Sequence, residues 1–191
     1  STSLIALKFG STTGLSIYNG KSFKSFNSLD GIPFGWVNAI LVEGTNIWLG
    51  SLDGLVLYNG KKFRVYTEDD GLSNPWIRTI KKGPNGKIWI GTNFGLSIFN
   101  GSKFSKLWTI DGLPNNGVNG IYFDKSGNAI ISTAGGVMKY NGKTFVRLNP
   151  SQGEYNFELK AGGEINRTKD GIYWFNDAGG SGTVSYTHLT L

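Results

Sequence analysis

The chain of 191 residues contains no cysteine, and its single histidine, His188, lies close to the C-terminus. Without thiols there is no disulfide, no cysteine nucleophile and no zinc site built on thiolates. One histidine excludes a triad that uses histidine as its base, and it excludes a metal site with several histidines. Any catalysis would have to use carboxylates, and the sequence shows no repeated acidic cluster. We therefore expect no enzymatic activity, no cofactor and no bound metal.

Long apolar runs are also absent. No run approaches the roughly 18 apolar residues of a transmembrane helix. The first residues, Ser1–Leu4, show neither the basic start nor the apolar run of a signal peptide. The sequence is therefore typical of a cytosolic protein or of a chain that begins downstream of a leader.

Proline is scarce, with 5 residues, whereas the 29 glycines are about twice the usual share. This glycine content is too high for a helical protein, and there is no Gly-X-Y period. Aromatic residues make up 14% of the chain, which excludes a disordered protein. The length suits one domain with its own core. The net charge of +6 allows an acidic partner without requiring one.

A repeat of about 41 residues is the strongest feature of the sequence. Aromatic positions followed by Asn-Gly recur with spacings of 40, 41 and 41 residues, at Tyr18, Tyr58, Phe99 and Tyr140. An Asp-Gly-Ile or Asp-Gly-Leu step recurs with spacings of 40 and 41, at Asp30, Asp70 and Asp111. Large apolar residues follow at spacings of 41, 41 and 44, at Trp48, Trp89, Ile130 and Trp174. This period is that of β-propeller blades, each with four strands.

Residues 76–108 show the strand pattern of one repeat. Residues 76–80 and 104–108 alternate between apolar and polar side chains, and residues 88–92 form a short apolar run typical of a buried strand. Asn100-Gly101 lies between two such strands and predicts a tight hairpin of type I′. Each repeat therefore predicts four strands, A to D, with strand A nearest the propeller axis.

The expected fold class is all-β: a β-propeller segment of about four and a half four-stranded blades in residues 1–183. The expected blades are 1–26 (partial), 37–67, 76–108, 118–148 and 157–183 (partial). Propellers of this blade length commonly have more blades, so we expect part of a larger ring. The alternative is a four-bladed ring in which the C-terminal strands complete the N-terminal blade.

Residues 184–191 break the register of the repeat. Their sequence looks like translated sequencing adapter, which would make them a non-native tail. The alternative is a third strand of the last blade.

The repeat resembles a known family. Residues 112–121, the turn at 124–128, the run Ile88–Thr92 and Gly95-Leu96 resemble the two-component regulator propeller repeat. The resemblance covers residues 14 to about 148. The run at 129–133 lacks the tryptophan, and 149–157 lacks the Asp-Gly-Leu step, so the last blade matches least well.

This resemblance implies a ligand-sensing module in the periplasmic, or extracytoplasmic, part of a bacterial signalling protein. Many sensors of this family recognise glycan fragments. Contact with a membrane would be made only by segments outside this chain, and a homodimer could form through the full-length sensor.

The candidate ligand site lies on the propeller face that carries the B–C turns and the D–A connections. The D–A connections are longer than a turn requires, and such length often serves function. Aromatic rings and amides occur there together, as carbohydrate recognition requires, although the rings could instead cap the blade ends. The expected ligand-binding residues are Phe34, Trp36, Asp53, Asn74, Trp76, Asn93, Phe94, Asn115 and Asn116. The expected partner is a glycan, neutral or acidic, or another small molecule.

Two other functions remain as alternatives: a polysaccharide-active propeller enzyme, either lyase or glycosidase, and a protein-interaction scaffold. An enzyme would have to use carboxylates such as Glu68–Asp70, but three adjacent carboxylates do not predict the controlled separation that glycosidases need. We interpret this cluster as a solvated loop.

The lysines follow the hairpin turns and form no stripe, so we expect no nucleic-acid partner. Residues 124–128 resemble the start of a calcium loop without its later glutamate, and we expect a turn.

Overall fold

The computed structural model describes residues 5–7, 14–18, 20–32, 36–148, 161–167, 173–177 and 184–187. In these ranges the chain forms five antiparallel sheets, and its only helical residues belong to three 3₁₀ turns. The turns are η1 (Ser28–Asp30), η2 (Pro84–Gly86) and η3 (Thr109–Asp111). No helix of the described part is long and apolar enough to cross a membrane.

Three sheets have four strands each, paired in chain order, and we call them the second, third and fourth blades. The second blade contains β4 (Ala39–Glu43), β5 (Asn46–Gly50), β6 (Leu55–Tyr58) and β7 (Phe63–Tyr66). The third contains β8 (Ile77–Lys82), β9 (Ile88–Thr92), β10 (Leu96–Phe99) and β11 (Phe104–Leu107). The fourth contains β12 (Val118–Phe123), β13 (Ala129–Thr133), β14 (Gly136–Tyr140) and β15 (Phe145–Arg147). These strands are the predicted A, B, C and D.

A three-stranded sheet lies on each side of these blades in the sequence. The first contains β1 (Ile5–Leu7), β2 (Leu15–Tyr18) and β3 (Phe23–Phe26). The last contains β16 (Ala161–Arg167), β17 (Tyr173–Asp177) and β18 (Val184–Thr187). The sequence left open whether residues 184–191 are a non-native tail or a strand. Residues 184–187 form a strand, which pairs with β17.

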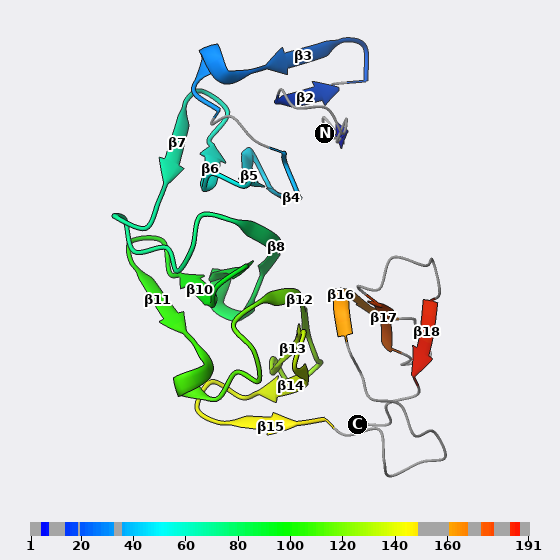
Figure 1. The fold of residues 1–191 in the computed structure, drawn as a ribbon. Coiled ribbons are helices and arrows are strands. Elements are labelled where there is room, and N and C mark those ends of the chain that lie inside the picture. The colour runs from blue at the N-terminus through cyan, green and yellow to red at the C-terminus, as the bar shows by residue number, and fades with distance from the viewer. Residues whose placement is uncertain are drawn as a thin grey trace.

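The sheets follow one another along an arc, with their first strands on its inner side and their last strands outside (Figure 1). Strand β4 contacts β8, and β12 contacts both β8 and β16. This arrangement is that of successive propeller blades, and the predicted all-β propeller segment is confirmed.

The tryptophans Trp48 and Trp89 of the repeat pack between blades. Trp48 on β5 is 4% exposed and meets Phe99 of the next blade at a ring distance of 5.7 Å. Trp89 on β9 is 8% exposed and meets Phe123 of the fourth blade at 5.2 Å. The side chain of Trp174 lies outside the described residues. These tryptophans therefore join the second blade to the third and the third blade to the fourth.

Glycine after the apolar run of strand B lets neighbouring blades approach closely. A Cβ atom on Gly50 would lie 2.3 Å from Cγ2 of Ile77, the first residue of β8. A Cβ atom on Gly91 would lie 2.8 Å from the carbonyl oxygen of Val118, the first residue of β12. In the second and third blades the apolar run of strand B thus ends in glycine because strand A of the next blade lies against it, whereas the fourth blade has Ser132 at this position.

The Asp-Gly-Ile and Asp-Gly-Leu steps shape the outer half of each D–A connection. In each, the aspartate accepts a hydrogen bond from the backbone N–H three residues earlier, at 2.8–3.0 Å. The glycine that follows has φ between 96° and 111°, a conformation that other residues rarely adopt. The apolar residue is buried, with an exposed fraction of 0–4%, at Ile32, Leu72 and Leu113. These steps therefore have a structural role. Asp70, the last residue of the cluster Glu68–Asp70, is one of the aspartates that accept such a hydrogen bond.

The C–D hairpins differ from the predicted type. In each hairpin the asparagine side chain accepts hydrogen bonds from two backbone N–H groups, at 2.8–3.0 Å. Positive φ occurs at the glycine alone, whereas a type I′ turn needs it at both central residues. The prediction of type I′ turns was therefore wrong. Glycine at the first of the two central positions is typical of a type II′ turn. The three hairpins begin at Asn59, Asn100 and Asn141.

Candidate functional site

The B–C turns present the first group of candidate residues, and all three described turns share one design. A serine or threonine hydroxyl donates to the carbonyl of the glycine three residues later, at 2.7–3.1 Å. The same oxygen accepts a hydrogen bond from the N–H two residues later, at 3.1 Å. The turns begin at Ser51, Thr92 and Thr133. This network holds Asp53 and Phe94 at the tips of their turns, where both are exposed.

The D–A connections present the second group, and here the amide side chains also have local roles. The side-chain oxygen of Asn74 accepts from the N–H of Trp76 at 3.1 Å, and that of Asn115 accepts from Gly117 at 2.8 Å. The side-chain oxygen of Asn116 accepts from the N–H of Thr109 at 2.9 Å. These three amides were predicted to bind the ligand, and the structure shows that their oxygens also shape the loops.

The aromatic rings of the site face solvent. Trp36 is 64% exposed, Trp76 46% and Phe94 56%. The repeat positions of Trp48 and Trp89 are buried by contrast, so exposure separates these rings from the core tryptophans. Phe34, also predicted for the site, lies outside the described residues.

Backbone hydrogen bonds bring these loops together. The N–H of Asn93 donates to the carbonyl of Trp76 at 2.9 Å. The N–H of Gly95 donates to the carbonyl of Asn116 at 2.7 Å, which joins the third blade to the fourth. The N–H of Ile77 donates to the carbonyl of Ser51 at 2.8 Å, which joins the second blade to the third. We call this surface the loop mouth and define it as residues 36–38, 51–54, 74–78, 92–95 and 115–119.

Three residues of the loop mouth were not predicted from the sequence. Asn38, Arg78 and Asn119 occupy equivalent positions at the start of strand A, with spacings of 40 and 41 residues. The guanidinium of Arg78 donates to the side-chain oxygens of Asn93 and Asn119. The side-chain nitrogen of Asn38 donates to the carbonyl of Ile77 at 3.1 Å. Partial burial lowers the pKa of Arg78. The repeat spacing was the signal that could have identified these positions.

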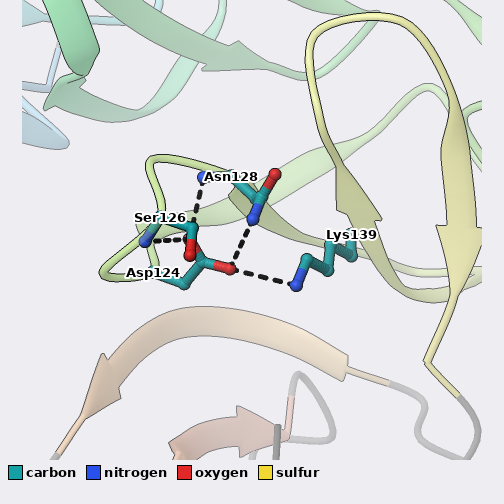
Figure 2. Close-up of polar contacts among 4 residues, drawn as sticks. All are labelled: Asp124, Ser126, Asn128 and Lys139. Atoms are coloured by element: carbon teal, nitrogen blue, oxygen red, sulfur yellow. Dashed lines mark hydrogen bonds and ion pairs between the residues drawn. The ribbon is translucent and has the colours of Figure 1, made fainter.

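The turn at 124–128 is a closed structural unit, as Figure 2 shows. One oxygen of Asp124 accepts from the N–H groups of Ser126 and Asn128 at 2.9 and 2.8 Å. The other accepts from the side chain of Asn128 at 2.8 Å and pairs with Lys139 at 3.1 Å. The predicted turn is therefore confirmed, and both carboxylate oxygens already have protein donors. Among the described residues, no three acidic or histidine side chains gather in a group that could hold a metal ion.

Known proteins share the repeat and the fold. Residues 71–94 match the model of the family described as "Two component regulator propeller". No curated protein sequence matches the chain. The extracellular domain of a protein described as a hybrid two component system, BT3049 from B. thetaiotaomicron, is 22% identical with a TM-score of 0.70. The match covers 90% of this chain and 26% of that domain.

Two further structures have a similar fold. The extracellular domain of BT4673 from B. thetaiotaomicron, described as a one component system, is 17% identical over 97% of this chain and 31% of that domain, with a TM-score of 0.53. Virginiamycin B lyase from Staphylococcus aureus is 14% identical over 98% of this chain and 67% of that protein, with a TM-score of 0.70. The chain thus spans about a quarter to a third of the two extracellular domains, and these likenesses establish the fold. The chain is a β-propeller segment that carries the two-component regulator propeller repeat, matched at residues 71–94.

Proposed function

We propose that this chain is part of the ligand-sensing module of a bacterial signalling protein, and that its loop mouth binds a carbohydrate fragment. The repeat match and the similarity to extracellular domains of two component systems support the sensor class and an extracytoplasmic location. The loop mouth supports the ligand class.

The observation that carries the proposal is the exposure of Trp36, Trp76 and Phe94, whose loops are linked by hydrogen bonds in the loop mouth. An aromatic side chain has about 150–250 Å² of surface, so half-exposed rings leave roughly 100 Å² each for a ligand. At about 25 cal/mol per Å², covering one ring contributes about 2.5 kcal/mol before the costs of binding. Sugar rings have an apolar face that can cover such a ring, and their hydroxyls can bond neighbouring amides. Because ordering the ligand offsets much of this gain, we expect modest affinity.

The acidic cluster gives little support to an enzyme. Asp70 caps the N–H of Thr67 at 3.0 Å and pairs with Arg64 at 3.7 Å, both close to the end of the outer strand β7. Its structural role accounts for its recurrence in the repeat. We therefore propose a binding function for the chain and no catalytic one. Similarity to a propeller lyase at 14% identity extends to the fold alone.

Calorimetric titration with a panel of neutral and acidic oligosaccharides tests the proposal. The test variant is the double substitution Trp36→Ala, Trp76→Ala, and the control is Leu29→Ala, Ile110→Ala, which removes exposed apolar side chains from η1 and η3. We expect a ligand whose binding the first variant loses and the control retains, with both variants folded by circular dichroism. Equal binding by the wild type and the tryptophan variant would show that the loop mouth is not the site. Turnover of a panel member by the wild type would favour an enzyme.

A further inference from the structure

Arg78 occupies an unusual position in the loop mouth. Ile77 pairs with Thr92 and Thr79 pairs with Gly91, so Arg78 is the extra residue of a bulge in β8. Asn119 is the corresponding residue of a bulge in β12, between Val118 and Gly120. A bulge redirects the side chain of its extra residue, and bulges are frequent beside functional sites.

The guanidinium of Arg78 is oriented by two neutral amides. One is Asn93 in the B–C turn of the same blade, and the other is Asn119 on the first strand of the next blade. Asn119 is only 7% exposed, so its position is well determined by packing. A guanidinium has five N–H donors, and these two bonds leave donors for a further acceptor.

The charge of Arg78 has no carboxylate partner among the residues that the structure describes. The ion pairs found there join Arg64 to Asp70, Lys82 to Glu43 and Lys139 to Asp124. Partial burial lowers the pKa of Arg78, yet a guanidinium stays protonated at neutral pH. Arg78 is exposed, so an anion in solution can reach its guanidinium.

The rings of the loop mouth lie on either side of this cation in the chain. Trp76 precedes Arg78 by two residues, and its carbonyl accepts the hydrogen bond from Asn93. Phe94 follows Asn93 directly and is 56% exposed. Asn93 thus bonds both the carbonyl of Trp76 and the side chain of Arg78, and we expect a ligand that covers these rings to reach the guanidinium.

We infer that Arg78 binds an acidic group of the ligand, so that the ligand is an acidic glycan containing a uronic acid. A carboxylate can accept two parallel hydrogen bonds from a guanidinium, which gives both charge and geometric selectivity. Asn93 and Asn119 are positioning residues that hold the guanidinium for this contact. The inference rests on the proposed function, because it assigns the charge of the carbohydrate bound at the same loop mouth.

Matched sugar pairs test the inference. The probes are tetrasaccharides of pectate, alginate and hyaluronan, each titrated together with its carboxyl-reduced counterpart. The wild type should bind at least one acidic tetrasaccharide about 10- to 100-fold more tightly than its reduced form, the range expected for a charged hydrogen bond. Raising the salt concentration should weaken the acidic sugar selectively.

Three variants separate the role of Arg78 from folding. Arg78→Met should abolish the preference for the acidic sugar, so that this variant binds the acidic and the reduced sugar with similar affinity. Asn93→Asp keeps Arg78 but supplies a carboxylate in place of an amide oxygen, and it should reduce the preference in the same way. Arg64→Met, on the outer strand β7, is the control and should behave as the wild type.

The outcomes distinguish this inference from the proposed function. Equal affinity of the wild type for acidic and reduced sugars overturns the inference and leaves carbohydrate binding intact. An acid preference that persists in folded Arg78→Met and Asn93→Asp overturns it as well. If no tetrasaccharide and no member of the wider panel binds, both the proposed function and the inference are wrong.

Discussion

Replacing Gly91 with alanine tests how closely the blades must approach. The added Cβ would lie 2.6 Å from Cγ2 of Thr79, 2.7 Å from Cγ1 of Val118 and 2.8 Å from the carbonyl oxygen of Val118. Thr79 is 2% exposed and Val118 is fully buried, so neither side chain has space to move aside. The carbonyl oxygen belongs to the backbone of β12, so relief requires the fourth blade to shift.

The expected cost follows from two opposing effects. Overpacking of a close-packed interior costs about 1–3 kcal/mol. Gly91 does not have a positive φ, so alanine adds no backbone strain, and it stabilises by about 0.4–1 kcal/mol through the unfolded chain. We therefore expect Gly91→Ala to lower the free energy of unfolding by about 1–2 kcal/mol. For a chain of this size, this corresponds to a decrease of roughly 2–8 °C in the thermal midpoint.

Gly117→Ala is the matched control. Its Cβ would meet only the side-chain oxygen of Asn115 at 3.2 Å and the carbonyl oxygen of Asn93 at 3.7 Å. The equivalent positions of the other repeats hold Trp36 and Trp76, so this site accommodates a side chain. Urea unfolding followed by tryptophan fluorescence should show Gly91→Ala less stable than Gly117→Ala. Equal stability of the two variants would refute the argument that the glycine of strand B is required by the approach of the next blade.

Three further predictions concern the turns and the core. Asp70→Ala should lower the free energy of unfolding by about 1 kcal/mol because it removes the hydrogen-bond acceptor for the N–H of Thr67. Asp69→Ala in the same turn should leave the free energy of unfolding almost unchanged. Equal effects of the two variants in urea unfolding would contradict the capping role of Asp70. Leu72→Ala should lower the free energy of unfolding by about 2–5 kcal/mol because Leu72 is fully buried. A decrease below about 1 kcal/mol would contradict that packing. Burial alone would raise the pKa of Asp124, but hydrogen bonds from Asn128 and Lys139 and the charge of Lys139 outweigh burial and lower it. The stability from Asp124 is therefore present above the unfolded-state pKa and is lost as pH falls through the lower folded-state pKa. The thermal midpoint of Asp124→Asn should lie below that of the wild type at pH 7 and approach it in acid, and a constant difference would contradict the shift.

The fold could be predicted from the sequence because the repeat places the same residue types at the same structural positions. An aromatic residue before Asn-Gly, a glycine after the apolar run and an Asp-Gly-Leu step each have a local physical cause that recurs in more than one blade. The fourth blade has Ser132 in place of the glycine and lacks the Asp-Gly-Leu step. The hairpin type was mistaken because Asn-Gly was assigned to both central positions of the turn. The structure instead puts asparagine one residue earlier, where its side chain caps the loop.

The candidate site could be predicted only in part. Exposed rings at Trp36, Trp76 and Phe94 follow from loop length and position, and the structure brings the loops of Trp76 and Phe94 together. Arg78 was missed because simple alternation makes it an ordinary residue of strand A. A bulge shifts the register by one residue, and nothing in the local sequence of β8 signals it. Neither Asn93 nor Asn119 is close to Arg78 in sequence, so their contacts depend on the assembled blades.

The most direct test of a ligand site at the loop mouth is a titration followed by the indole N–H signals in nitrogen-15 nuclear magnetic resonance spectra. Phe substitutions of single tryptophans assign these signals. Addition of the acidic tetrasaccharide that binds best should move the signals of Trp36 and Trp76, which are 64% and 46% exposed. The signals of Trp48 and Trp89, which are buried between blades, should stay in place. Shifts confined to the buried tryptophans, or saturable binding that leaves Trp36 and Trp76 unchanged, would contradict the assignment of the site.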